Sequence, residues 1–130
     1  MLLEKYVNEN IIGQARKKIG GRNLDTQYHQ KDKLLYITIT EEIDHHVTEK
    51  IRRKVDNEIT RHMPRKTIFD FSRVAFMDSA GIGMIIGRYK MMKLIGGSLE
   101  IQNVNESTKK ILEMSGILKI VPITELKIAQ

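Results

Sequence analysis

The hydrophobic positions near the start of the chain recur every fourth residue. Between residues 2 and 19, the residues that would share one side of a helix are Leu3, Val7, Ile11, Ala15 and Ile19. Such a pattern predicts an amphipathic helix, and the following Gly20 and Gly21 predict its end. We therefore expect an N-terminal helix followed by a linker over residues 20–24.

Three later stretches show the same helical spacing, over residues 45–62, over residues 80–95 and after Asn105. Asp44 and Asn105 are residue types that accept hydrogen bonds from the free N–H groups at a helix start, so both are predicted N-caps. Gly116 predicts the end of the last helix, since glycine adopts the left-handed conformation found there.

Between the helices lie short runs rich in β-branched and other hydrophobic residues, which predict strands. The expected strands are at residues 26–29, 34–40, 66–71, 98–102 and 118–121. Because strands alternate with helices, the connections are β-α-β crossovers and the sheet is mostly parallel. The predicted fold class is α/β: a small mixed sheet of four or five strands packed with helices, plus an N-terminal helical extension.

The chain has 130 residues, which suits one domain over residues 24–130 preceded by an extension over residues 1–23. It has no cysteine, so a disulfide framework is excluded, and no apolar run is long enough for a membrane span. The net charge of +6 is spread along the chain, and only 5% of residues are aromatic. We therefore expect solvated basic faces and no direct binding of nucleic acid.

Ser79 is the main candidate for chemistry, because it lies where a strand and loop give way to a helix. One interpretation is a helix cap, with Asp78 competing for that role. The other is a reversible phosphorylation site, since a helix start favours negative charge. Gly81 would then leave the backbone open to an approaching kinase.

The helix after Ser79 presents a line of small and flexible side chains: Ala80, Met84, Gly87 and Met91. Small residues allow a partner's backbone to approach closely, and methionine adapts to varied surfaces. This line is a candidate partner surface. The alternative is that Gly83 and Gly87 let the helix lie close to its own sheet.

A hydrolase and a metal site are both disfavoured. The sequence Met77-Asp78-Ser79-Ala80-Gly81 lacks the first glycine of the G-x-S-x-G nucleophile elbow. Adjacent histidines such as His45 and His46 point in different directions on a helix, so they do not form a metal-binding pair. No catalytic residue, no metal ligand and no cofactor is predicted.

Three stretches of the chain, in order, resemble the STAS-domain anti-sigma-factor antagonists of bacteria, particularly the sporulation stage II type. Residues 42–46 resemble the segment leading into the first helix of that family. Residues 76–83 with 87–90 resemble its phosphorylation motif, and residues 114–120 its third helix and final strand. Ala80 departs from the family, which often has Ser or Thr there.

The resemblance implies a cytoplasmic partner-switching protein, not an enzyme, that acts in transcription regulation during sporulation or stress response. Unphosphorylated, it would bind an anti-sigma factor that is a GHKL-type serine kinase, and so free the sigma factor. That kinase would phosphorylate Ser79, and a PP2C-type phosphatase would reset the switch. The expected partner-binding residues are Asp44, His45, Asp78, Ser79, Ala80, Gly81, Gly83, Met84 and Gly87.

The sequence leaves open both the function of the domain and the role of the N-terminal extension. The chain could instead be a STAS scaffold or sensor module in another bacterial signalling assembly. The N-terminal extension could cover an apolar surface of the domain, or could be a basic arm that docks on a partner. We expect a monomer when the protein is free.

Overall fold

The computed structural model describes residues 17–18, 24–40 and 42–124. In chain order the strands are β1 (Lys17–Lys18), β2 (Leu24–His29), β3 (Leu34–Ile39), β4 (Lys66–Asp70), β5 (Ser98–Gln102) and β6 (Ile123–Thr124). The helices are α2 (His45–His62), α3 (Ser79–Leu94), α4 (Glu106–Ser115) and the 3-10 helix η2 (Ile117–Lys119).

The strands form one sheet in the order β1-β2-β3-β4-β5-β6. The pairs β1–β2 and β2–β3 are antiparallel, and every later pair is parallel. Each parallel connection carries a helix, as β-α-β crossovers require. The predicted α/β fold with a mixed, mostly parallel sheet is therefore confirmed.

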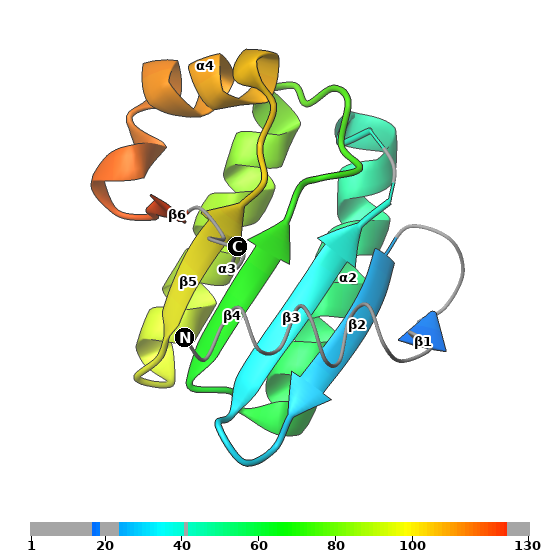
Figure 1. Ribbon diagram of the computed structural model, residues 1–130, viewed down its shortest axis with the longest axis vertical. Helices are drawn as coiled ribbons and strands as arrows, with labels where there is room; N and C mark the ends of the chain where they lie inside the picture. The colour runs from blue at the N-terminus through cyan, green and yellow to red at the C-terminus, as the bar shows by residue number, and fades with distance from the viewer. Residues whose placement is uncertain (1–16, 19–23, 41, 125–130) are drawn as a thin grey trace, which may run out of the picture.

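Helices α2 and α3 lie side by side against one face of the sheet (Figure 1). The apolar side of α2 is fully buried there through Ile51, Val55 and Ile59, the positions that the spacing of four predicts. The strands contribute Ile37, Phe69 and others to the same core. Burial of each such side chain is worth about 1.5–3 kcal/mol, so this face holds the helices in place.

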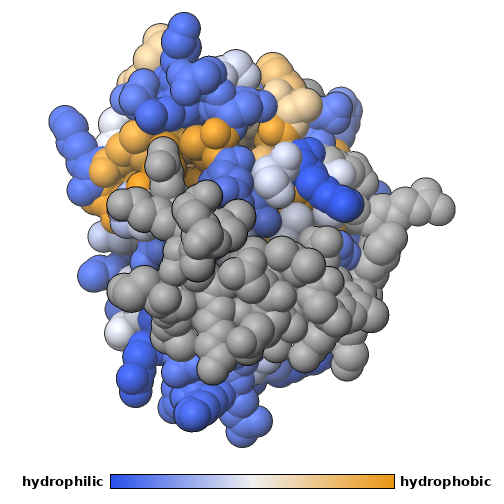
Figure 2. All heavy atoms as spheres, viewed as in Figure 1, coloured by the Kyte–Doolittle hydropathy of each residue, from blue (hydrophilic) through white to orange (hydrophobic). Residues whose placement is uncertain are grey.

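The predicted helix ends are close to the observed ones. Asp44 and Asn105 are the N-caps of α2 and α4, and Gly116 ends α4 in the left-handed conformation with φ of 80°. On the side seen in Figure 2, hydrophobic side chains gather between α4 and the sheet. Ile111 and Leu118 are among the partly buried residues that pack against the core.

The predicted strand over residues 118–121 is wrong. Its first two residues belong to η2, and the last strand is β6, after Pro122. The reason is the spacing of Ile117 and Val121, which are both buried and linked by a hydrogen bond from Val121 N to Ile117 O of 2.9 Å. A helical turn buries both residues and leaves Lys119 exposed, whereas a strand would place Lys119 on the same face as Ile117 and Val121.

The end of the predicted N-terminal helix is also wrong, because Lys17 and Lys18 form strand β1 beside β2. The remainder of that helix, over residues 2–16, lies outside the described residues, as does most of the linker. Leu24, placed in the linker from the sequence, is a fully buried residue of β2. The domain boundary at residue 24 stays a prediction.

Candidate functional site

Helices α2 and α3 begin next to each other because the segments leading into them are hydrogen-bonded. Ile43 and Met77 form an isolated parallel bridge. Ile43 N donates to Phe76 O at 2.9 Å, and Asp78 N donates to Ile43 O at 3.0 Å. Since Asp44 and Asp78 directly follow the bridged pair, the two helix starts lie side by side.

Each helix start is capped by its aspartate. Asp44 Oδ1 accepts hydrogen bonds from the backbone N–H of His46 at 2.9 Å and of Val47 at 3.2 Å. Asp78 Oδ1 accepts from the N–H of Ala80 at 2.9 Å. Asp78, not Ser79, is therefore the cap of α3, and Ser79 is the first residue of the helix. Its side chain is exposed.

The electrostatic field at this site has two opposing parts. Each helix start carries about half a positive charge from its aligned peptide dipoles. Asp44 and Asp78 are half-buried and place two carboxylates in the same region. A further anion on Ser79 would thus meet free N–H groups from the helices and repulsion from both caps.

Gly81 has a structural purpose that the sequence interpretation missed. A Cβ at this buried position would clash with the side chain of Met77 and lie 3.0 Å from Cγ2 of Ile43. Both neighbours are fully buried. Gly81 therefore lets α3 approach the bridge, and the reason given for it above, an open backbone for a kinase, is wrong.

Gly83 and Gly87 differ from Gly81, because a Cβ at either position would have no atom within 4 Å. The alternative that they let α3 lie close to its own sheet is therefore wrong. They leave the outward side of the helix bare. Met84, predicted on the partner surface, is only 3% exposed and belongs mainly to the core.

Two hollows lie near the starts of α2 and α3. One, of about 250 Å³, lies between α2 and α3 and is lined by Thr48, Glu49, Arg52, Ala80, Gly83 and Met84. The other, of about 460 Å³, is lined by Thr40, Glu42, Asp44, Val47 and Phe76. Of the predicted partner residues, Asp44 lines the second hollow, and Ala80, Gly83 and Met84 line the first. His45 is the first residue of α2, and its side chain lies outside what the structure describes.

Sequence reasoning missed Phe76 as a candidate contact residue. Its side chain is 51% exposed, although it lies directly before the buried Met77. Exposed aromatic side chains are frequent anchors in protein interfaces. The sequence feature that could have identified Phe76 is its position two residues before Asp78, inside the loop that carries the candidate site.

The loop before Ser79 is held from a neighbouring element. The side-chain amide of Asn105 donates hydrogen bonds to the carbonyls of Val74 at 3.2 Å and Ala75 at 3.3 Å. Asp70 Oδ1 accepts from Ser72 N at 2.9 Å and from the amide of Asn103 at 3.0 Å. These contacts fix the backbone on which Ser79 is presented.

Ion pairs line the same two helices. Glu49 is paired with Arg52 and Arg53 on the exposed side of α2, and the hydrogen bond from Arg52 lowers the pKa of Glu49. Between the helices, Arg88 Nε of α3 lies 2.7 Å from Asp56 Oδ1 of α2. Burial lowers the pKa of Arg88 and raises that of Asp56, in spite of their mutual attraction.

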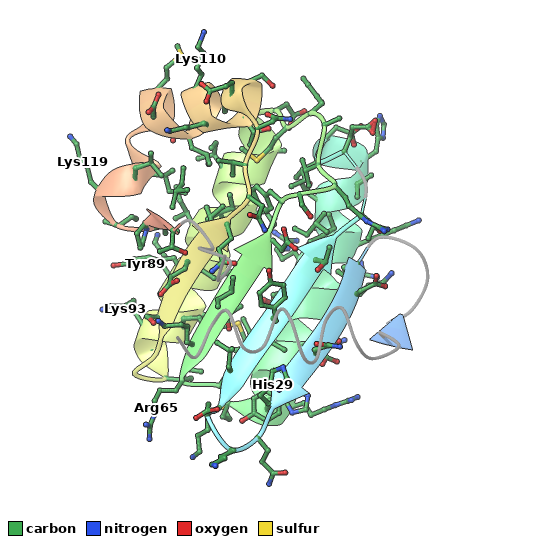
Figure 3. All side chains as sticks on the ribbon, viewed as in Figure 1. His29, Arg65, Tyr89, Lys93, Lys110 and Lys119 are labelled. Atoms are coloured by element: carbon green, nitrogen blue, oxygen red, sulfur yellow. The ribbon has the colours of Figure 1, made fainter. Side chains whose placement is uncertain are left out.

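The remaining charges are dispersed. Figure 3 shows Lys93, Lys110 and Lys119 pointing outwards from α3, α4 and η2. Across residues 17–18, 24–40 and 42–124, no group of three His, Cys, Asp or Glu side chains is placed to hold a metal ion. No helix in these ranges has the length and hydropathy needed to cross a bilayer.

Residues 25–129 match the STAS domain family, and the chain belongs to this family. It is 34% identical over 101 residues to the anti-sigma F factor antagonist of Paenibacillus polymyxa, covering 78% of this chain and 86% of that protein. It is 28% identical over 102 residues to the anti-sigma-B factor antagonist of Bacillus subtilis (strain 168), covering 78% of this chain and 90% of that protein.

The fold is also similar to a solved structure, that of the anti-sigma factor antagonist SpoIIAA in its unphosphorylated form. The TM-score is 0.65 at 24% sequence identity, over 87% of this chain and 89% of the other. This likeness concerns the fold. Together with the STAS match, it confirms the fold family that the sequence resemblance implies.

Proposed function

We propose that this chain is an anti-sigma factor antagonist that is switched off by phosphorylation of Ser79. The observation that carries the proposal is the exposed Ser79 side chain at the first position of α3, where Asp78 already provides the cap. The hydroxyl is thus available for modification without loss of the helix cap. The names of the relatives support the antagonist function.

The proposed partner is an anti-sigma factor that is also a GHKL-type serine kinase, with a PP2C-type phosphatase removing the phosphate. The contact surface consists of the exposed side of α3 around Gly83 and Gly87, with Asp44 and His45 at the start of α2. Phe76 and Arg52 border this surface through the two hollows. Outward-facing glycines would let a partner's backbone lie close against α3.

A phosphate at Ser79 adds about −1.5 to −2 charges. In the free protein this charge is solvated and is partly balanced by the two helix dipoles. In a complex it would be desolvated beside Asp44 and Asp78, and an unpaired charge in an interface costs several kcal/mol. Because each 1.4 kcal/mol changes affinity tenfold, a loss of a hundredfold or more is expected.

In this account the protein is a kinase substrate and a binding module, without catalytic activity of its own. It acts in the cytoplasm as a monomer when free, and does not bind nucleic acid directly. No cofactor enters the mechanism, since the switch consists of one phosphate ester made and removed by partner proteins.

The test uses the anti-sigma factor kinase, ATP and purified full-length chain. Mass spectrometry should locate one phosphate on Ser79 and none after Ser79→Ala. Ser72→Ala is the matched control, because Ser72 is an exposed serine of the same loop and should leave phosphorylation unchanged. Ser79→Ala should keep the kinase bound in the presence of ATP.

Two results would contradict the proposal. One is phosphorylation at another residue with Ser79 untouched. The other is a complex that persists after Ser79 is phosphorylated, which would favour the alternative of a STAS scaffold or sensor module in another signalling assembly.

A further inference from the structure

The sheet has a second face, opposite to α2 and α3. Side chains alternate between the two faces of a strand, and Leu35, Ile37 and Phe69 belong to the core with the helices. Leu34, Tyr36 and Ile68 therefore point to the other side. The register pairs Tyr36 with Ile68, so these apolar side chains form one patch across β3 and β4.

This patch is buried. Ile68 is fully buried, Tyr36 is 2% exposed and Leu34 is 5% exposed. An antiparallel or mixed sheet with one face open to water shows alternating burial along each strand, whereas every residue of β3 is buried. Among the described elements, no helix lies over this face (Figure 1). The patch therefore has a cover that does not come from α2, α3 or α4.

The polar groups around the patch are also engaged. Tyr36 Oη donates to Gln102 Oε1 at 3.3 Å, and Gln102 Nε2 donates to Thr124 Oγ1 at 3.2 Å. Lys66 Nζ lies 2.6 Å from Glu100 Oε2. On the same face of the neighbouring strand β2, polar or ring contacts are also made by Asp25, Gln27 and His29.

We propose that residues 1–16 of the chain cover this patch. The argument starts at β1, which pairs with β2 and so brings the chain to the edge of the sheet directly after residue 16. Sixteen helical residues span about 24 Å. Strands β2 to β5 are three spacings apart, or about 14 Å, so the segment is long enough to cross them.

The hydrophobic pattern of the segment fits the patch. Leu3, Val7 and Ile11 lie on one side of a helix, and they would meet the apolar centre formed by Leu34, Tyr36 and Ile68. Charged residues such as Lys5 and Glu9 lie on the opposite side, toward solvent. The N-terminal segment is thus part of the core, on the face away from the proposed partner surface. This inference does not depend on the proposed function.

The test uses the full chain, which contains no cysteine, so that single cysteines can be introduced without background. Leu3→Cys, Val7→Cys and Ile11→Cys should react with a thiol reagent at least tenfold more slowly than Lys5→Cys and Glu9→Cys, the matched controls. In denaturant all five should react at one rate. Equal rates in the native protein would overturn the proposal.

The location of the cover is tested by a second substitution in the Val7→Cys chain. Ile68→Glu should raise the reactivity of that thiol, whereas Met114→Glu, at an exposed position of α4, should not. Should Ile68→Glu fail to fold by circular dichroism, Leu34→Ala is the milder change on the same patch. Thiol reactivity unaltered by substitutions in the patch would overturn the location.

The source of the cover is tested by dilution. Protection from the same chain is independent of protein concentration, and the protein runs as a monomer on gel filtration. Protection that disappears on dilution would assign the cover to a second copy. Protection that requires an added partner protein would assign it to that partner, and either result would overturn the proposal.

Discussion

Helices α2 and α3 begin in the same way and then differ in what they expose. Both start beside the Ile43–Met77 bridge, and both are capped by an aspartate. The outward side of α2 carries ion-paired charges such as Glu49 and Arg52, which suit a solvated helix. The outward side of α3 carries Gly83 and Gly87, with open space around them.

The two outward glycines of α3 lower the stability of the fold. A glycine in a helix interior costs about 0.5–1 kcal/mol relative to alanine, and neither Gly83 nor Gly87 regains this through packing. Gly81, by contrast, is required by its contacts with Met77 and Ile43. Gly83 and Gly87 thus lower the stability of α3 without a packing role. Because α3 also begins with Ser79, we place the partner surface on the outward side of this helix.

The largest effect is expected for Gly81→Val. The new side chain would overlap Met77 and push α3 away from the bridge, which should lower the free energy of unfolding by about 3 kcal/mol. Urea denaturation measures this. The equivalent position of α2 is Val47, so Val47→Ile serves as the control and should change stability little. An unchanged midpoint for Gly81→Val would mean that the helix starts are not tightly packed.

A smaller effect of opposite sign is expected for Gly83→Ala and Gly87→Ala. Each should raise the free energy of unfolding by about 0.5–1 kcal/mol, because the methyl group meets no neighbour and the unfolded chain loses freedom. Each should also weaken binding to the anti-sigma factor by tenfold or more. Calorimetric titration measures the affinity, and increased stability with unchanged affinity would remove these glycines from the surface.

The matched control for both glycine variants is Asn57→Ala, an exposed position of α2. It changes helix propensity on the neighbouring helix and leaves the outward side of α3 unaltered. Its affinity for the partner should equal that of the unsubstituted chain.

The smallest effect concerns the Asp56–Arg88 pair between the helices. Burial raises the pKa of Asp56 above its ordinary value of 3.8, so the folded state holds this proton to higher pH than the unfolded state does. Stability from this group is therefore present at low pH and is lost as pH rises through the raised pKa. Asp56→Asn should lack this loss, so its stability relative to the unsubstituted chain should increase as pH rises.

Denaturation curves from pH 3 to 7 test this sign. The unsubstituted chain should lose stability relative to Asp56→Asn as pH rises across this window. A clear destabilisation by Asp56→Asn at pH 7 would show that the attraction to Arg88 outweighs the cost of burial.

The sequence predicts most of the elements because their signals are local. Asp44, Asn105 and Gly116 cap helices where the sequence places them, and the spacing of Ile51, Val55 and Ile59 identifies the buried side of α2. Residues 118–121 were assigned incorrectly because a short hydrophobic run has no period that separates a strand from a buried turn.

The site was less predictable, because its details depend on tertiary contacts. Ser79 and Asp78 are both capping residue types, and only the fold decides that Asp78 accepts the bond from Ala80. Gly81 and Gly83 look alike in sequence, yet one faces Met77 and the other faces open space. Phe76 was missed because no local pattern distinguishes an exposed aromatic residue from a buried one.

The most direct test of the account is the affinity of the anti-sigma factor for two forms of the same chain, with and without a phosphate on Ser79. Isothermal titration calorimetry should give a dissociation constant at least a hundredfold larger for the phosphorylated form. Equal affinities for the two forms would contradict the account, because the phosphate would then not act as the switch.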